Sequence, residues 1–427
     1  MGACSDTAGS YAATGRGLLY AATGTYSVLY AFFRCYGILV GRKSHLYKRV
    51  EACGAFHAPL QTGRSLWCIR MHLYNFIRKV TLEYAESLNK WFLQHQREMP
   101  WRLTRDPYCI WVSEIMLQQT QVDTVIPYYE RFIEQFPTLK TLAEASLEEV
   151  FFLWRGLGYY RRAENLHKGA KKIIEELNGS FPGTMEESLN IPGIGAYTAG
   201  AIMSIAFNLP VPAVDGNVMR ILSRQFALDE DISKPKARNV FEKQVMSLMG
   251  GEPRIFNQAM MELGALICTP KSPKCDICPL IHLCKAYVQG NPEAYPVKSK
   301  KPKPLEETYV ALILQKEGAY LLEKRPAEGL LANLWGFPLL EEKTFPKILE
   351  DLLKHWETGD IKTLEPVNHV FTHRKWCLKP VIIAYSSLAD KGVEKYCQSG
   401  QYQFFIREAM SELPIATVFQ KVIDQLG

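Results

Sequence analysis

LNIPGIGAYTAGAI, residues 189–202, is the most informative segment of this 427-residue chain. Gly193 and Gly195 allow a tight turn whose bare backbone N–H groups can be approached closely. A helix is expected to begin at about Ala196 and to point its positive end outward. The turn and the helix start together would bind a DNA phosphate without reading any base sequence. Taken alone, the segment could also be an ordinary glycine-capped helical turn.

A second segment, VDGNVMRI (214–221), follows shortly after this turn. Its Asp215 precedes an expected helix, and an aspartate in such a place is usually only an N-cap. The segment gains meaning only from its position between the hairpin and the cysteine loop described next.

Four of the eleven cysteines are concentrated within 17 residues and are separated by six, two and five residues. Zinc ribbons usually pair two Cys-x-x-Cys knuckles across a long gap. A single knuckle with uneven spacing favours a cubane [4Fe–4S] cluster, although zinc or two disulfides remain alternatives. The expected ligands are Cys268, Cys275, Cys278 and Cys284.

The hairpin, the aspartate and the cysteine loop, in this order and spacing, resemble the endonuclease III superfamily of DNA glycosylases over residues 80–288. The resemblance implies an all-α helix-hairpin-helix domain, divided between a six-helix lobe and a cluster lobe, with a structural rather than catalytic cluster. It also implies that the first cluster loop presents Lys271 and Lys274 to the DNA backbone.

Tyr197 indicates which chemistry the chain lacks. Bifunctional members of the superfamily place a lysine here as the amine that attacks C1′ and forms a Schiff base. A phenol cannot form that imine, so we expect a monofunctional enzyme without strand cleavage. Tyrosine also occurs here in some thymine-mismatch glycosylases, so the residue does not settle the substrate.

RDPYCIWVSEIMLQQTQVDTVIPYYERF, residues 105–132, resembles the signature of MutY-type adenine DNA glycosylases. In a helix, Glu114 has mostly apolar neighbours, which should desolvate its carboxyl and raise its pKa. Such a group suits a general acid that protonates N7 of adenine. Asp215 would stabilise the oxocarbenium-like sugar, electrostatically or through a transient covalent bond. The alternative for Glu114 is a solvated carboxylate on a helix face.

The same resemblance implies further site residues. Core packing is the alternative interpretation for Tyr159 and Tyr160. The expected assignments are Arg97 and Arg102, flanking Trp101, in the adenine pocket; Asn217 near the reacting sugar and Tyr197 in support of Asp215; Gln118, Gln119 and Thr120 in the turn that enters the DNA stack; and Tyr159 as the wedge beside the oxidised guanine.

The pattern of apolar residues changes from helical to strand-like after a Pro- and Lys-rich linker at 289–306. Residues 308–325 predict two strands around a Lys-Glu-Gly turn, and residues 307–427 resemble the MutT-like (Nudix-fold) domain of MutY proteins. The Glu-rich helix that holds metal in Nudix pyrophosphatases is missing, so we expect a domain that binds 8-oxoguanine without hydrolysis. Its expected reading loop is Phe371, Thr372 and His373, although His373 could be merely structural.

Residues 1–70 hold eight basic and two acidic side chains, which account for the whole net charge of +6. The remainder is neutral, so overall charge does not argue for DNA binding. This segment resembles a transit peptide, or else it lies upstream of a true start at Met71. Its uncharged stretch 17–33 is a poor membrane span. We expect no stable membrane association, a monomer, and a location in the bacterial cytoplasm or nucleoid, or in a nucleus or mitochondrion if the segment is genuine.

The sequence therefore predicts a multidomain protein in which an all-α helix-hairpin-helix glycosylase domain with a [4Fe–4S] loop precedes an α+β Nudix-like domain. The expected function is removal of adenine mispaired with 8-oxoguanine or guanine in double-stranded DNA. One rival is a thymine or oxidised-pyrimidine glycosylase, which would need neither Glu114 nor the C-terminal domain. The other is a catalytically dead DNA-binding or cluster-sensing protein, which would not need both carboxylates.

Overall fold

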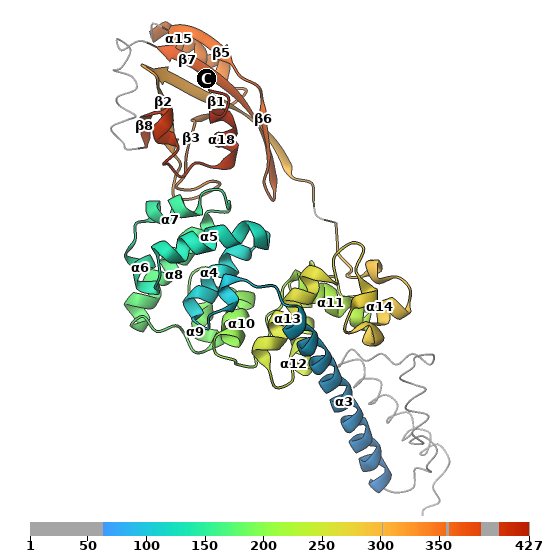
Figure 1. Cartoon of the computed structure of the whole chain (residues 1–427). Helices are drawn as coiled ribbons and strands as arrows, with labels where there is room; N and C mark the ends of the chain where they lie inside the picture. The colour runs from blue at the N-terminus through green and yellow to red at the C-terminus, as the bar shows by residue number, and fades with distance from the viewer. Residues whose placement is uncertain (1–62, 301, 356–357, 386–400, 427) are drawn as a thin grey trace, which may run out of the picture. The chain divides into compact units, whose positions relative to one another are not determined.

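The computed structural model describes residues 63–300, 302–355, 358–385 and 401–426 (Figure 1). Most of the N-terminal segment 1–70, including the stretch 17–33, lies outside these ranges. Within them, no helix is both long and apolar enough to cross a bilayer.

The described chain forms two compact units. Of the described residues, the first unit combines 63–96 with 208–299, and the second combines 97–207 with those from Lys300 onward. The predicted helical domain 80–288 thus contributes to both units. Its part in the second unit, residues 97–207, is called the helical lobe below.

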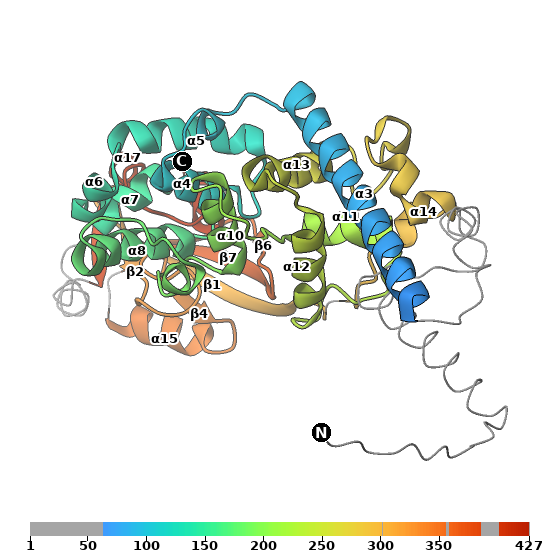
Figure 2. The same cartoon turned by 90° about the horizontal axis from the view of Figure 1, so that it is seen from below.

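The first unit is helical and is built around α3, which packs against α12 and α13 (Figure 2). The buried side of α3 carries Tyr84, Leu88 and Phe92, each at most 2% exposed, at the four-residue spacing of one helix face. Leu82, in contrast, is 44% exposed. The helices are α3 (Gly63–His95), α11 (Gly216–Phe226), α12 (Ala237–Leu248), α13 (Pro253–Leu266) and α14 (Lys285–Val288), with 3₁₀ turns at Cys275–Ile277, Ile281–Leu283 and Pro292–Ala294.

The helical lobe of the second unit contains mainly short helices around a core of large aromatic side chains. Trp111, Phe132 and Trp154 are fully buried, and the last two rings meet edge to face at 6.0 Å. The helices are α4 (Pro107–Leu117), α5 (Val122–Gln135), α6 (Leu139–Glu144), α7 (Leu147–Trp154), α8 (Arg161–Leu177), α9 (Met185–Leu189) and α10 (Ala196–Ile205), preceded by a 3₁₀ turn at Pro100–Arg102.

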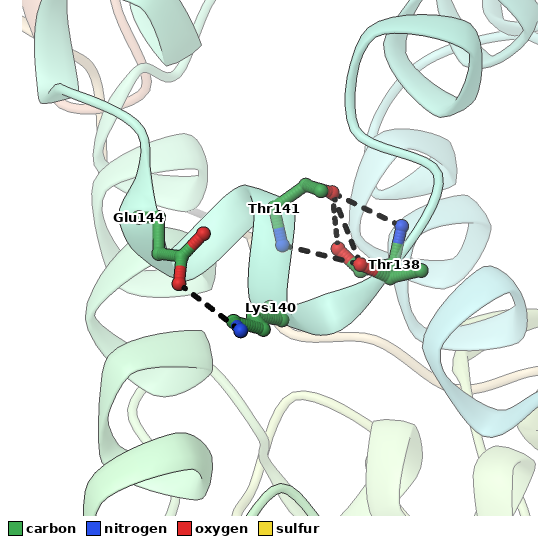
Figure 3. A network of polar contacts seen from close by, with 4 residues as sticks. All are labelled: Thr138, Lys140, Thr141 and Glu144. Carbon is green, nitrogen blue, oxygen red and sulfur yellow. Dashed lines mark hydrogen bonds and ion pairs between the residues drawn. The ribbon is translucent and has the colours of Figure 1, made fainter.

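Short helices in this lobe depend on their N-caps. At α6 the Thr138 hydroxyl accepts from the Thr141 N–H at 3.2 Å, and the Thr141 hydroxyl accepts from the Thr138 N–H at 3.1 Å (Figure 3). An ion pair between Lys140 and Glu144, 3.7 Å apart, lies on the exposed side of the same helix. The two backbone bonds satisfy two of the free N–H groups at the start of a six-residue helix, which is too short to be stable alone.

The C-terminal domain is a mixed eight-stranded sheet with helices on both faces (Figure 1). Its centre is a parallel pairing of β1 with β7, and the other pairings are antiparallel. Val310, Leu312 and Leu314 face α15, whereas α18 packs on Gly336 and Phe337 through Phe419. The elements are β1 (Leu305–Lys316), β2 (Ala319–Lys324), β3 (Trp335–Gly336), β4 (Leu339–Glu341), α15 (Phe345–His355), β5 (Thr358–Thr363), β6 (Val367–Val370), β7 (Arg374–Tyr385), β8 (Tyr402–Ile406), α17 (Arg407–Met410) and α18 (Thr417–Ile423).

The predicted pair of strands at 308–325 is confirmed as β1 and β2. Glu317 and Gly318 form the turn between them with φ of 50° and 81°. Two consecutive positive φ values are typical of the tight hairpin turn that matches strand twist.

The segment predicted as a linker is attached to the first unit over part of its length. The Arg224 Nε donates to the Tyr295 carbonyl at 3.1 Å, and the Ile232 N–H donates to the Val297 carbonyl at 3.1 Å. Both the N–H and the hydroxyl of Ser299 donate to the Asp231 carboxylate. Since β1 begins at Leu305, only residues 300–304 separate this attached segment from the sheet.

Candidate active site

Glu114 lies in the middle of α4 and is buried, with 6% of its surface exposed. The start of the helix is fixed at Pro107 because the Asp106 side chain accepts from the Tyr108 N–H at 2.8 Å and proline is favoured at the first helical position. The interpretation of Glu114 as a solvated carboxylate is therefore wrong, and the expected desolvation of this side chain is present.

Three candidate residues for the adenine pocket lie around one 3₁₀ turn ahead of α4. Trp101 is buried and meets the Tyr129 ring edge to face at 5.2 Å. The Arg102 Nη1 donates to the Arg97 carbonyl at 2.9 Å, which brings the two arginines to the same turn. Both arginines are partly buried.

The turn after α4 holds the residues expected to enter the DNA stack. Gln118 is the C-cap of α4, and the exposed Gln119 has a φ of 60°, in the left-handed region. The Thr120 N–H donates back to the Leu117 carbonyl at 3.3 Å, which closes the turn.

Tyr159 and Tyr160 have different environments. Tyr160 is 8% exposed and its ring packs edge to face against Phe151 at 5.4 Å, so the core-packing interpretation is correct for it. Tyr159 is 51% exposed and has a φ of 50°. It is available at the surface, as a wedge would be.

The hairpin between α9 and α10 has the expected shape. α10 begins at Ala196, as predicted, with Gly195 as its N-cap. Gly193 has a φ of 83°, and a Cβ there would lie 3.1 Å from the Asn165 Cβ, so only glycine fits without strain. Gly195 has an extended backbone and open space around its Cα, so the fold itself does not require glycine there.

Tyr197 is half-buried in the first turn of α10. The first N–H groups of that helix lack acceptors within the helix. Together with Gly193 and Gly195, these groups form the turn and helix start expected from the sequence.

Asp215 is held by two directed hydrogen bonds at the start of α11. Its Oδ1 accepts from the Val218 N–H at 2.8 Å, which makes it the N-cap of the helix. Its Oδ2 accepts from the Asn217 amide Nδ2 at 2.7 Å. The carboxylate is therefore fixed in orientation, and it remains only partly buried.

Arg220, which the sequence analysis did not single out, connects Asn217 to the cysteine loop. Its Nη2 donates to the Asn217 Oδ1 at 2.8 Å and to the Gly264 carbonyl at 2.9 Å, while its Nε donates to the Cys268 carbonyl at 2.8 Å. A continuous chain of hydrogen bonds thus runs from the Cys268 backbone through Arg220 and Asn217 to Asp215.

Gly264 on α13 makes this chain possible. A Cβ at this position would lie 2.7 Å from the Asn217 Cβ, which is closer than such atoms can approach. Glycine inside a helix is unfavourable by itself. Its presence here is explained because α13 must pass close to α11 to hold Asn217 and Arg220 in place.

The four cysteines expected to bind the cluster line one pocket in the first unit. Burial, together with the charges of the neighbouring thiols, raises the pKa of Cys275 and Cys284, and it raises the pKa of Cys278 to about 12. Four thiolates so placed would repel one another unless iron neutralised them. The donor set therefore fits an iron–sulfur cluster.

No group of three or more Cys, His, Asp or Glu side chains in the described part of the chain is arranged for a single metal ion. A cluster differs from such a site because each thiolate binds a different iron atom. The four thiols line a common pocket, which is compatible with such a cluster.

Arg224 secures the loop that carries Cys268. The side chain is 2% exposed and its Nη1 donates to the Cys268 Sγ at 3.4 Å and to the Thr269 carbonyl at 2.6 Å. Its Nη2 donates to the Pro270 carbonyl at 2.8 Å. This buried cation also places positive charge beside the thiolates.

Lys271 and Lys274 are exposed on the same loop. Between them, the Ser272 N–H donates to the Glu293 carboxylate at 2.8 Å. Glu293 thus fixes the loop from the attached linker segment, and the sequence pattern gave no sign of this.

The reading loop expected at 371–373 is the turn between β6 and β7, and its three side chains differ. Thr372 and His373 are exposed. Phe371 packs instead against Trp376, with ring centres 4.9 Å apart, and against His369 at 4.5 Å. Thr372 and His373 are therefore exposed at the tip of the turn, whereas Phe371 is partly buried.

Comparisons with known proteins agree with this architecture. The model of the "HhH-GPD superfamily base excision DNA repair protein" family matches residues 112–246, that of the "Iron-sulfur binding domain of endonuclease III" matches 268–284, and that of the "NUDIX domain" matches 309–425. The chain therefore joins the helix-hairpin-helix, the iron–sulfur loop and the Nudix-like domain in this order.

Similar curated proteins include the adenine DNA glycosylase of Rattus norvegicus, 38% identical over 71% of this chain and 70% of the relative. The adenine DNA glycosylase of Homo sapiens is also 38% identical, over 71% and 67%. That of Buchnera aphidicola subsp. Schizaphis graminum is 37% identical over 70% and 86%. Because the match spans more than two thirds of each relative, the chain belongs to the adenine DNA glycosylase family, the MutY-type DNA N-glycosylases with an iron–sulfur cluster.

Proposed function

We propose that this enzyme is a monofunctional glycosylase which removes adenine mispaired with 8-oxoguanine, and also with guanine, in double-stranded DNA. The observation that carries the proposal is Glu114, a carboxyl buried at 6% exposure on α4 inside the 105–132 signature. A thymine or oxidised-pyrimidine glycosylase would not need this carboxyl, because its substrate base has no N7 to protonate.

In the proposed reaction Glu114 donates a proton to N7 of adenine, because the neutral base is a poor leaving group. As the N-glycosidic bond breaks, the sugar gains positive charge, and the Asp215 carboxylate stabilises it electrostatically or through a transient covalent bond. The hydrogen bonds from Val218 and Asn217 support this role, since they preset the orientation of that carboxylate. Tyr197 offers no amine for a Schiff base.

Adenine must leave the duplex before either group can act on it. We propose that the turn at Gln118, Gln119 and Thr120 fills the gap that adenine leaves in the base stack. Tyr159 inserts beside the oxidised guanine. The extruded adenine binds in a pocket formed by Arg97, Trp101 and Arg102. Lys271, Lys274 and the hairpin at Gly193 and Gly195 would bind phosphates, which position the DNA without reading its sequence.

We propose the [4Fe–4S] form of the cluster, held by Cys268, Cys275, Cys278 and Cys284. The cluster would supply structural order and no reaction step. The support is the uneven ligand spacing and the common pocket of the four thiols.

One assay tests the substrate. Single-turnover base release should be fast on adenine opposite 8-oxoguanine, slower on adenine opposite guanine, and absent on thymine opposite guanine and on thymine glycol. Borohydride should trap no covalent protein–DNA adduct, because Tyr197 cannot form an imine. Release of thymine in preference to adenine would overturn the proposal.

Recognition of the opposite base is assigned to the exposed tip of the β6–β7 turn. Replacing Thr372 by valine and His373 by alanine together should lower the ratio of rates on the 8-oxoguanine and guanine mispairs by about 10-fold, because two hydrogen-bonding side chains are removed. Thr363→Val, at an exposed position on β5, is the matched control. Equal loss on both mispairs would contradict a reading role for this turn.

Arg220 should matter to base release through Asn217. Arg220→Leu removes the donors to Asn217, Gly264 and Cys268, and we expect adenine release to slow by about 10- to 100-fold. Iron content, followed by the visible absorbance of the cluster, should remain near normal because the arginine touches only a ligand's carbonyl. If iron is lost in proportion to activity, the residue serves the cluster and not Asp215.

A further inference from the structure

Arg162, in the first turn of α8, joins two turns that are far apart in the sequence. One is the turn at 118–120 after α4, and the other is the turn at 157–159 before α8. Both lie in the helical lobe, and both were assigned above to insertion into DNA. The sequence analysis gave Arg162 no role.

The contacts of the guanidinium are almost all with backbone carbonyls. Nη1 donates to the carbonyls of Ile115 at 2.8 Å, Met116 at 3.1 Å and Gln118 at 2.5 Å. Nη2 donates to those of Gly158 at 3.2 Å and Leu157 at 3.4 Å. One side chain thus closes the end of α4 and ties it to the second turn.

The charge of Arg162 suits this position. The carbonyls at the end of a helix lack partners within it and carry partial negative charge. The guanidinium lies 5.5 Å from the centre of the Trp154 ring and 5.6 Å from that of Tyr159. Burial lowers the pKa of Arg162 to about 10, so the group is still charged at neutral pH.

The two turns need such support because each contains an unfavourable backbone conformation. Gln119 has a φ of 60° and Tyr159 a φ of 50°, and neither is glycine. Residues with side chains adopt this region only when surrounding contacts hold them there. Arg162 binds the carbonyls directly before both residues, those of Gln118 and Gly158.

We propose that Arg162 is a positioning residue that makes the Gln118–Thr120 turn and Tyr159 one rigid wedge, so that the two insert into the DNA stack together. The proposal rests on the proposed function, because it assumes that these turns enter DNA. Without Arg162, each turn would reach the duplex separately, and extrusion of adenine would become the slow step.

The test uses the full chain with its cluster and three variants. Arg162→Leu removes all the bonds. Arg162→Lys keeps a charge, but its single donor nitrogen cannot replace both Nη1 and Nη2, which bind different turns. Arg161→Leu changes the exposed neighbouring arginine and is the matched control. Base extrusion is followed by the fluorescence of 2-aminopurine placed opposite 8-oxoguanine, and base release is followed under single turnover.

Arg162→Leu should lose most of the fluorescence increase and slow release from a paired duplex by about 10- to 100-fold. Arg162→Lys should be intermediate, and Arg161→Leu should behave like the wild type. On DNA with the adenine already unpaired in a small bubble, the defect of both Arg162 variants should largely disappear. This rescue separates a positioning role from general damage to the fold.

Two outcomes would overturn the proposal. One is a normal fluorescence increase together with a normal rate of adenine release from duplex DNA in both Arg162 variants. The other is an equal loss on duplex and bubble DNA, which would make Arg162 a purely structural residue. Failure of the proposed function is recognised separately, because the wild-type enzyme would then release no adenine from either DNA.

Discussion

Replacement of Asp215 by asparagine is expected to slow adenine release by at least about 1000-fold while leaving DNA binding nearly unchanged. The substitution removes the negative charge that the proposed mechanism places against the cationic sugar, and it also removes any nucleophile for a covalent intermediate. Asparagine is as good an N-cap as aspartate. The bond to the Val218 N–H, and with it the start of α11, should therefore survive.

Single-turnover kinetics and a binding titration on the same mispaired duplex would measure the two effects. Asp229→Asn provides the matched control, because this exposed carboxylate lies in the same unit and shares none of these contacts. An Asp215→Asn enzyme that turns over at near-normal rate would contradict the assignment. Parallel loss of binding would show that the substitution had damaged the fold.

Most of the architecture follows from local patterns in the sequence. The start of α10 at Ala196 is predictable because Gly193 and Gly195, two residues apart, favour a tight turn directly before a helix. The β1–β2 hairpin is predictable because two short apolar strands flank a Lys-Glu-Gly turn. The burial of Glu114 follows from the apolar residues around it on one helix.

The residues that the sequence analysis missed share a different property. Arg162 and Arg220 bind mainly backbone carbonyls that lie more than 40 residues away, at Ile115 and Cys268 for example. Because every residue has a backbone carbonyl, the sequence does not show which carbonyl an arginine binds. Arginine in an amphipathic helix is, moreover, normally a surface residue.

Misleading local patterns account for other differences. Phe371 lies beside Thr372 and His373 in sequence, but its ring also contacts Trp376 across the β6–β7 hairpin, and the sequence does not reveal this contact. The Pro- and Lys-rich linker was expected from composition. Its attachment through Ser299 depends on Asp231, 68 residues earlier, which composition does not reveal.

Glu114→Gln is the second change expected to have a very large effect. Glutamine is nearly the same size as glutamate and fits the same buried position on α4, but it has no proton to donate to N7 of adenine. Adenine release at neutral pH should fall by about 100- to 10,000-fold, the usual contribution of a positioned general acid. Because a neutral amide replaces a buried carboxyl, stability should be unchanged or slightly higher. Thermal unfolding of the full chain would check this.

A structural role for Glu114 would give the same loss of rate, so the pH dependence is the decisive measurement. Solvent can protonate N7 directly in acid, and the slow rate of Glu114→Gln should therefore rise steadily as the pH falls. A variant that is merely misfolded would show no such recovery. Glu130→Gln, on the exposed side of α5, should keep the wild-type profile. If Glu114→Gln retains near-normal release at neutral pH, the proton must come from another group, and the buried glutamate would have to be reassigned to packing.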